Sequence, residues 1–175
     1  TGIGYEIAKI MASHKHDIVL AARDKTQLNN VKQEIESNYN VAVKVYVVDL
    51  SQPGSAKKLY EKCKGDGVEI LVNNAGVGLK GDFFSDDLAK NTAMAHLNMI
   101  SLMELTHYFG NDFIKQKRGR ILNTASIVAF FPGPKQPVYY ASKAFVRSFS
   151  RALTYNLSGT GVTVTALHPG VTKTN

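Results

Sequence analysis

Two side chains whose types suit acid–base chemistry, Tyr139 and Lys143, lie four residues apart. The surrounding stretch predicts a helix over residues 138–158, so both side chains project from one face of it. A free phenol is a poor acid or base at neutral pH. An ammonium about 4 Å away stabilises the phenolate by roughly 4 kcal/mol at an effective dielectric of 20. The pair therefore predicts a tyrosine that exchanges protons near neutral pH.

This spacing alone is weak, because Tyr and Lys are four residues apart at two other places in the chain. The pair at 139 and 143 differs in its surroundings. Ser126 follows a predicted strand and precedes Tyr139 by 13 residues, and Asn98 precedes Ser126 by 28. Pro169-Gly170 follows the last predicted strand. The predicted acid–base role of Tyr139 and Lys143 therefore depends on the order and spacing of all these residues together.

The elements that must position these residues alternate along the chain. Apolar spacing predicts helices over residues 4–14, 25–38, 55–64, 86–116 and 138–158, and strands over 18–22, 41–48, 70–72, 120–125 and 162–167. Strands alternating with helices of this length predict βαβ units and a parallel sheet. The α/β fold class that follows is a doubly wound parallel sheet with helices on both faces, a three-layer αβα arrangement. Ligands bind such sheets at the carboxyl ends of the strands.

The composition of the chain narrows the classes of protein to which it can belong. With 175 residues, 44% of them apolar and 20% charged, the chain fits one globular domain over residues 1–175. A single cysteine, Cys63, cannot form an internal disulfide, which favours a reducing, cytoplasmic setting. No apolar run approaches the roughly 18 residues of a membrane span. The net charge of +7 fits solubility or an anionic partner, while scattered lysines argue against nucleic acid. The histidines have no metal-ligand spacing, so we expect no metal.

Together these residues resemble the classical short-chain dehydrogenases/reductases, and among them the NADP-preferring, general bacterial-type oxidoreductases. The resemblance covers essentially all of the chain and rests on Gly2-Ile3-Gly4, Asn73-Asn74-Ala75-Gly76, Ser126, the Tyr139 to Lys143 segment and Pro169-Gly170. It implies a Rossmann-like fold and hydride transfer between NADP(H) and a carbonyl or secondary alcohol. It also implies a first strand before Thr1, lying between the strands at 18–22 and 70–72, and a substrate loop after Asn175. The domain is therefore expected to be incomplete at both ends.

By this resemblance the catalytic residues are Asn98, Ser126, Tyr139 and Lys143. Tyr139 delivers the proton, Lys143 also bonds the nicotinamide ribose, and Ser126 bonds the substrate carbonyl. Asn98 distorts the long helix and holds a water that links the lysine to solvent. The alternative for Asn98 is a polar residue tolerated in a helix interface.

The resemblance also assigns the cofactor site. Its residues are Gly2, Ile3, Gly4, Arg23, Asp49, Leu50, Asn73, Ala75, Gly76, Tyr139, Lys143, Pro169, Gly170, Val171 and Thr174. The glycines admit a pyrophosphate at a helix N-terminus, although an ordinary helix start would also use them. Ala22 stands where an NAD-selective site has a carboxylate, and Arg23 can pair with a 2′-phosphate, so NADP(H) is expected over NAD(H). Asp24 is expected to cap the next helix.

Other residues at these strand ends leave alternatives open. Asp49 is expected to contact the adenine amine and Leu50 to cover the ring, although Asp49 or Ser51 could instead cap a helix. Asn74 could be purely structural, and His168 is expected to be so.

The predicted substrate is a medium-sized, hydrophobic carbonyl compound, because Phe130-Phe131-Pro132-Gly133-Pro134 forms an apolar wall between Ser126 and Tyr139. Fatty-acyl 3-keto groups and steroids both fit. A cofactor-binding regulatory protein on the same fold and a nucleotide-sugar epimerase or dehydratase are alternative functions. The family also implies a homodimer or homotetramer formed through its long helices.

Overall fold

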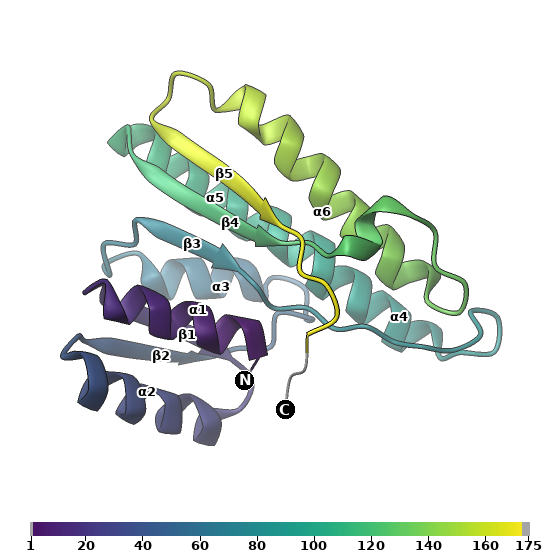
Figure 1. Ribbon diagram of the computed structural model, residues 1–175, viewed down its shortest axis with the longest axis horizontal. Coiled ribbons are helices and arrows are strands. Elements are labelled where there is room, and N and C mark those ends of the chain that lie inside the picture. Colours follow the sequence, from purple (N-terminus) through teal and green to yellow (C-terminus); the bar gives the residue numbers. More distant parts are fainter. Residues whose placement is uncertain (1, 173–175) are drawn as a thin grey trace. The chain divides into compact units, whose positions relative to one another are not determined.

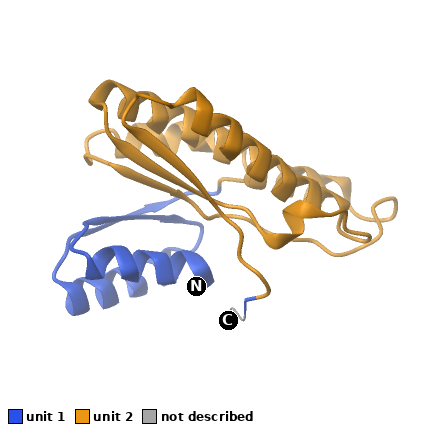
Figure 2. Cartoon of the chain, turned by 45° about the horizontal axis from the view of Figure 1, so that its top comes forward, with its two compact units in different colours: residues 1–49, 172–175 blue, residues 50–171 orange. Residues whose placement is uncertain are grey.

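The computed structural model describes residues 2–172. The chain divides into two compact units, one running to Asp49 and the other covering Leu50–Val171 (Figure 2). Thr172 is grouped with the first unit. The single domain over residues 1–175 stays a prediction.

The first unit is a two-stranded parallel sheet with two helices. Its elements are α1 (Gly2–Ser13), β1 (Ile18–Ala22), α2 (Lys25–Tyr39) and β2 (Val43–Val47). β1 pairs in parallel with β2, and the fully buried Ala12 and Ile35 of the two helices pack with Val43. Asp24 accepts a hydrogen bond from the backbone N–H of Gln27 at 2.9 Å, which confirms its predicted role as the cap of α2.

The second unit holds a three-stranded parallel sheet. Its elements are α3 (Ser55–Cys63), β3 (Ile70–Asn73), α4 (Leu88–Ala95), the π-helix η1 (His96–Ser101), α5 (Leu102–Gln116), β4 (Gly119–Thr124), the 3-10 helix η2 (Ile127–Phe130), α6 (Pro137–Asn156) and β5 (Val162–Leu167). The strand order is β3-β4-β5 (Figure 1). α5 packs against β3 and β4, while α6 packs against β4 and β5. Parallel strands joined through helices confirm the predicted Rossmann-like α/β fold.

The helix predicted over residues 86–116 begins at Leu88 and continues without a break to Gln116, but it is not uniform. It consists of α4, η1 and α5, and η1 has the i to i+5 hydrogen bonding of a π-helix. Asn98 lies inside η1. The distortion that the family resemblance implies at Asn98 is therefore present.

The two sheets are separate in their hydrogen bonding. Among residues 2–172, β1 pairs only with β2, and β3 pairs only with β4. The further strand expected between the segments at 18–22 and 70–72 stays a prediction. No helix in the described part of the chain is long and apolar enough to cross a membrane.

Candidate active site

Lys143 is a buried cation on α6. The residue is 6% exposed, and its Nζ donates a hydrogen bond to the backbone carbonyl of Thr124, at the end of β4, at 2.8 Å. Burial lowers the pKa of the Lys143 ammonium to about 8, because removal from water disfavours the charged form. An ammonium has three N–H groups, so two remain for other acceptors after the bond to Thr124.

Tyr139 lies one helical turn before Lys143 and faces it. The Lys143 Nζ is 5.8 Å from the centroid of the Tyr139 ring. α6 begins at Pro137, whose fixed φ suits a first helical turn and whose missing N–H is not needed there. Tyr139 therefore sits in the first turns of α6, half-buried. The predicted shared face of the two side chains is confirmed.

The side chain of Asn98 links the π-helix η1 to the loop after β3 and to the first turns of α6. Its Oδ1 accepts from the N–H of Val77 at 3.0 Å, and its Nδ2 donates to the carbonyl of Val77 at 2.9 Å. The same Nδ2 donates to Ser142 Oγ at 3.0 Å, and Ser142 Oγ donates to the carbonyl of Tyr139 at 2.7 Å. Asn98 is 1% exposed. Its amide therefore fixes the loop after β3 against the start of α6.

The loop after β3 approaches the site side chains very closely. A Cβ added to Gly76 would lie 3.2 Å from Asn98 Oδ1 and 3.3 Å from Lys143 Nζ. A Cβ added to Gly78 would lie 3.4 Å from the Tyr139 ring. The Gly76 contacts are tighter than a side chain normally tolerates, so glycine at this position lets the loop touch both Asn98 and Lys143.

Ser126 follows β4 at the same end of the sheet. It is 8% exposed, and its Oγ accepts from the N–H of Val128 at 3.3 Å, which caps the short helix η2. Thr124, which bonds Lys143, lies two residues earlier. The second unit thus brings Asn98, Tyr139 and Lys143 into one cluster and places Ser126 on the strand end that carries the bond to Lys143.

Asn73 takes part in a buried polar network. Its Nδ2 donates to Thr106 Oγ1 at 3.0 Å and to Asn123 Oδ1 at 2.9 Å. Asn123 in turn donates to Ser150 Oγ at 3.0 Å. The network joins β3, β4, α5 and α6. Both side-chain hydrogens of Asn73 are used here, so toward any other group its side chain can only accept, through Oδ1.

The predicted phosphate turn lies in the first unit. Gly2 has φ +63°, a conformation that other residues rarely adopt, and α1 begins there with no acidic side chain in its first turn. Ile3 and Gly4 continue α1, and Arg23 is exposed just after β1. An anion at this helix start would meet free N–H groups and the positive end of the helix dipole.

The remaining predicted cofactor residues lie mostly at strand ends. Asp49 ends the first unit and Leu50 begins the second. Ala75 is exposed beside Gly76, and Gly170 and Val171 are exposed after β5. The carbonyl of Pro169 accepts from the N–H of Ile127 at 3.1 Å, which ties the end of β5 to η2. Thr174 lies outside the described residues.

Several residues that position the site were not predicted from the sequence. Val77 and Ser142 hold Asn98, Thr124 holds Lys143, and Asn123 and Ser150 continue the network of Asn73. A signal existed for the last two, because a polar Asn interrupts the apolar run of β4 and a Ser faces the core from α6. Val77 and Thr124 contribute backbone groups, which leave no trace in the sequence, whereas Ser142 contributes its side-chain Oγ.

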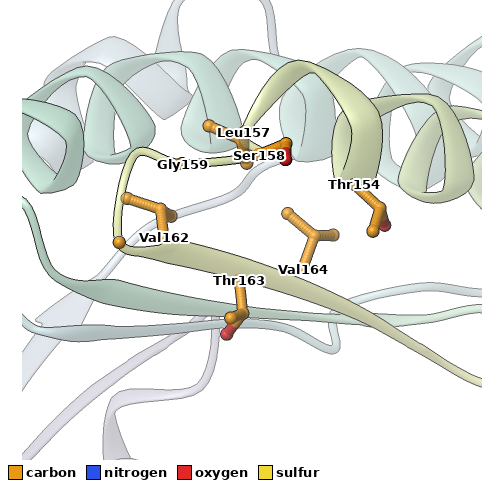
Figure 3. A pocket seen from close by; sticks show the side chains of 8 residues that line it. Thr154, Leu157, Ser158, Gly159, Val162, Thr163 and Val164 are labelled. Carbon is orange, nitrogen blue, oxygen red and sulfur yellow. The ribbon is translucent and has the colours of Figure 1, made fainter.

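A hollow of about 500 Å³ lies at the far end of α6 from Tyr139 (Figure 3). Its lining comes from the last turn of α6 and the start of β5, including Leu157, Val162 and Val164. None of the predicted site residues lines it. Within residues 2–172, no three His, Cys, Asp or Glu side chains are grouped as metal ligands would be.

Known proteins are similar to this chain in sequence and in fold. A sequence model of the family described as short chain dehydrogenase matches residues 1–175. An uncharacterized oxidoreductase of Staphylococcus saprophyticus is 33% identical over 176 residues, covering 99% of this chain and 75% of that protein. The very-long-chain 3-oxoacyl-CoA reductase of Anas platyrhynchos is 34% identical over 176 residues, covering 96% of this chain and 55% of the reductase.

A solved structure agrees with these sequence matches. The short-chain dehydrogenase from Sphingobium yanoikuyae, in complex with NADPH, superposes with a TM-score of 0.93 at 32% identity, over 98% of this chain and 68% of that one. The chain thus spans between about half and three quarters of the length of these relatives. A family match along the whole sequence, and relatives that share the parallel sheets and helices described above, mean that this chain belongs to the short-chain dehydrogenase family of oxidoreductases.

Proposed function

We propose that this chain carries the catalytic and cofactor-binding residues of a reductase that transfers a hydride between NADP(H) and a carbonyl or secondary alcohol. The main support is the buried ammonium of Lys143, whose Nζ lies 5.8 Å from the centroid of the Tyr139 ring. Burying a cation costs stability, and the bond to Thr124 uses one of its three N–H groups. A buried ammonium that lowers the stability of the fold, and that lies beside the Tyr139 phenol, fits a role in proton transfer.

In this proposal Tyr139 is the acid. Its hydroxyl gives a proton to the carbonyl oxygen of the substrate as the carbonyl carbon receives a hydride, so the product is an alcohol. Bound NADPH supplies the hydride. Lys143 stabilises the phenolate that Tyr139 becomes, and its other N–H groups would bind the ribose hydroxyls of the cofactor. Ser126 donates a hydrogen bond to the carbonyl oxygen while negative charge develops there. Alcohol oxidation follows the same steps in reverse.

The preference for NADP(H) rests on the end of β1. Ala22 has no group that can accept a bond from a ribose 2′-hydroxyl, whereas the exposed guanidinium of Arg23 can pair with a 2′-phosphate. When a dinucleotide is bound, the free N–H groups at the start of α1 would hold its pyrophosphate, and Asp49 and Leu50 are the residues that the family resemblance assigns to its adenine. A relative of the same fold in complex with NADPH supports this assignment.

We further propose a hydrophobic substrate. Phe130 and Phe131 are 57% and 53% exposed in the segment between Ser126 and Tyr139. Phe130 is held by two side chains, with the Arg147 guanidinium 4.3 Å and the His168 ring 5.1 Å from its ring centroid. This wall suits a long acyl chain or a fused-ring ketone, and one of the relatives is named as a very-long-chain 3-oxoacyl-CoA reductase.

Consumption of reduced cofactor tests the proposal. The purified protein is mixed with NADPH or NADH and, separately, with a 3-keto fatty acyl thioester, a ketosteroid, a small ketone and a nucleotide sugar. We expect NADPH to be consumed with one of the hydrophobic ketones, with NADH at least tenfold less efficient. Equal use of both cofactors would refute the role of Arg23. Conversion of the nucleotide sugar without net cofactor consumption, or no ketone reduction at all, would refute the reductase.

A further inference from the structure

The carbonyl of Leu50 is held by two side chains of the π-helix. Ser101 Oγ donates to it at 2.6 Å, across 51 residues of sequence. His96 Nδ1 lies 3.4 Å from the same carbonyl and 3.3 Å from Ser101 Oγ. Ser101 gives its one hydrogen to Leu50, and the His96 tautomer with a hydrogen on Nδ1 would add a second donor to the same carbonyl.

The π-helix is what brings these two side chains together. His96 and Ser101 are five residues apart, which in an α-helix would place them about 140° apart around the axis. The wider turn of η1 aligns residues i and i+5, so both reach the same carbonyl. Asn98 lies between them in the same segment and bonds Val77 on the catalytic side. The π-helix thus makes two sets of contacts: His96 and Ser101 contact Leu50, and Asn98 contacts Val77. Only the contacts of Asn98 lie among the residues of the proposed reaction.

Burial indicates that the Ser101 contact is part of the folded interior. Ser101 is 1% exposed, as is Asn98, while Leu50 is half-buried. Leu50 follows Asp49 directly, at the point where the chain leaves the first unit. A buried hydroxyl that bonds a loop carbonyl restricts the backbone of that loop, and so fixes where the Leu50 side chain and N–H point.

We propose that Ser101, assisted by His96, is a positioning residue for nucleotide binding, because its hydroxyl holds Leu50 in the place where the adenine is bound. This inference rests on the proposed function, in which Leu50 covers the adenine. Ser101 itself does not touch the nucleotide. It acts by holding Leu50 in place before the nucleotide binds, which lowers the conformational entropy cost of binding. It has no part in the chemical step.

The test compares Ser101→Ala with a matched control, Thr160→Val. Thr160 Oγ1 also donates to a backbone carbonyl at 2.6 Å, that of Leu157, at the other end of α6. Binding of NADPH and of adenosine 2′,5′-bisphosphate to the purified protein is titrated for each variant. We expect Ser101→Ala to raise both dissociation constants about fivefold, the effect of one neutral hydrogen bond, and to leave kcat at saturating NADPH within twofold. Thr160→Val leaves both dissociation constants unchanged.

The outcomes separate this inference from the proposed function. If the wild-type protein binds neither ligand, the proposed function fails. If the wild type binds both and Ser101→Ala binds them equally well, or loses kcat with unchanged dissociation constants, the positioning role is refuted. Should Ser101→Ala fail to fold, His96→Ala serves as the second variant, with an expected weakening of about twofold for both ligands and none if the inference is wrong.

Discussion

Replacement of Lys143 by methionine should make the protein more stable and nearly inactive at the same time. Burial lowers the pKa of the ammonium from its ordinary 10.5 to about 8. At 1.36 kcal/mol per pH unit, the buried charge costs about 3 kcal/mol of stability at pH 7. Methionine fills similar volume without the charge, but the carbonyl of Thr124 loses a hydrogen bond from a charged donor, which contributes about 2 kcal/mol. The net expectation is a gain of about 1 kcal/mol at pH 7.

The sign of this effect depends on pH. The folded protein releases the Lys143 proton more readily than the unfolded chain, so between pH 8 and 10.5 the unfolded state binds more protons and wild-type stability rises with pH. The advantage of Lys143→Met is therefore complete below pH 8 and is lost by pH 10.5. Subtracting the two unfolding free energies at each pH cancels the other titrating groups that both proteins share.

The same substitution removes the charge beside Tyr139. At the 5.8 Å between Nζ and the ring centroid, an effective dielectric of 20 gives about 3 kcal/mol of phenolate stabilisation, or on the order of a 100-fold loss of kcat. Urea unfolding without nucleotide at pH 7 and pH 10.5, with steady-state kinetics at pH 7, measures both effects. The reasoning is wrong if Lys143→Met is less stable than wild type at pH 7, or if the stability difference is the same at both pH values.

Three further substitutions test the site. Gly76→Ala places a methyl group 3.2 Å from Asn98 Oδ1 and 3.3 Å from Lys143 Nζ, so we expect kcat to fall at least tenfold, while Gly78→Ala, whose methyl meets the Tyr139 ring at an ordinary 3.4 Å, keeps most activity. Equal activity of the two variants would contradict the tight approach at Gly76. Arg23→Ala removes the proposed partner of the 2′-phosphate and should raise KM for NADPH roughly 10- to 100-fold, with KM for NADH unchanged. A parallel rise for both cofactors would show that Arg23 does not read the phosphate.

Local patterns in the sequence predict most of the elements. The strands at 18–22 and 162–167 have the predicted bounds, because apolar and β-branched runs are closed by charged or glycine-containing segments. The strand predicted over 41–48 is shorter, Val43–Val47, since only those residues pair with β1. The facing of Tyr139 and Lys143 follows from helical spacing alone, which is why it could be predicted.

The π-helix and the buried polar network could not be predicted from spacing. The segment His96–Ser101 contains no Pro or Gly that would mark a distortion, and its polar side chains bond partners far away in sequence, such as Val77 and Ser142 for Asn98. The resemblance to a known family supplied the distortion, whereas the residues alone indicated a regular helix. In the same way the bonds from the Asn73 amide to Thr106 and Asn123 could not be predicted from spacing, while the expectation that Asn73 lines a cofactor stays a prediction.

The most direct test of the proposed chemistry is Tyr139→Phe, which removes one hydroxyl and keeps the ring that lies beside Lys143 and Gly78. NADPH binding by titration and ketone reduction by steady-state kinetics are measured on the same preparation. We expect the dissociation constant of NADPH to change less than threefold and kcat to fall by at least 1,000-fold, because no other proton donor replaces the phenol. Ketone reduction at more than a tenth of the wild-type rate would contradict the assignment of Tyr139 as the acid.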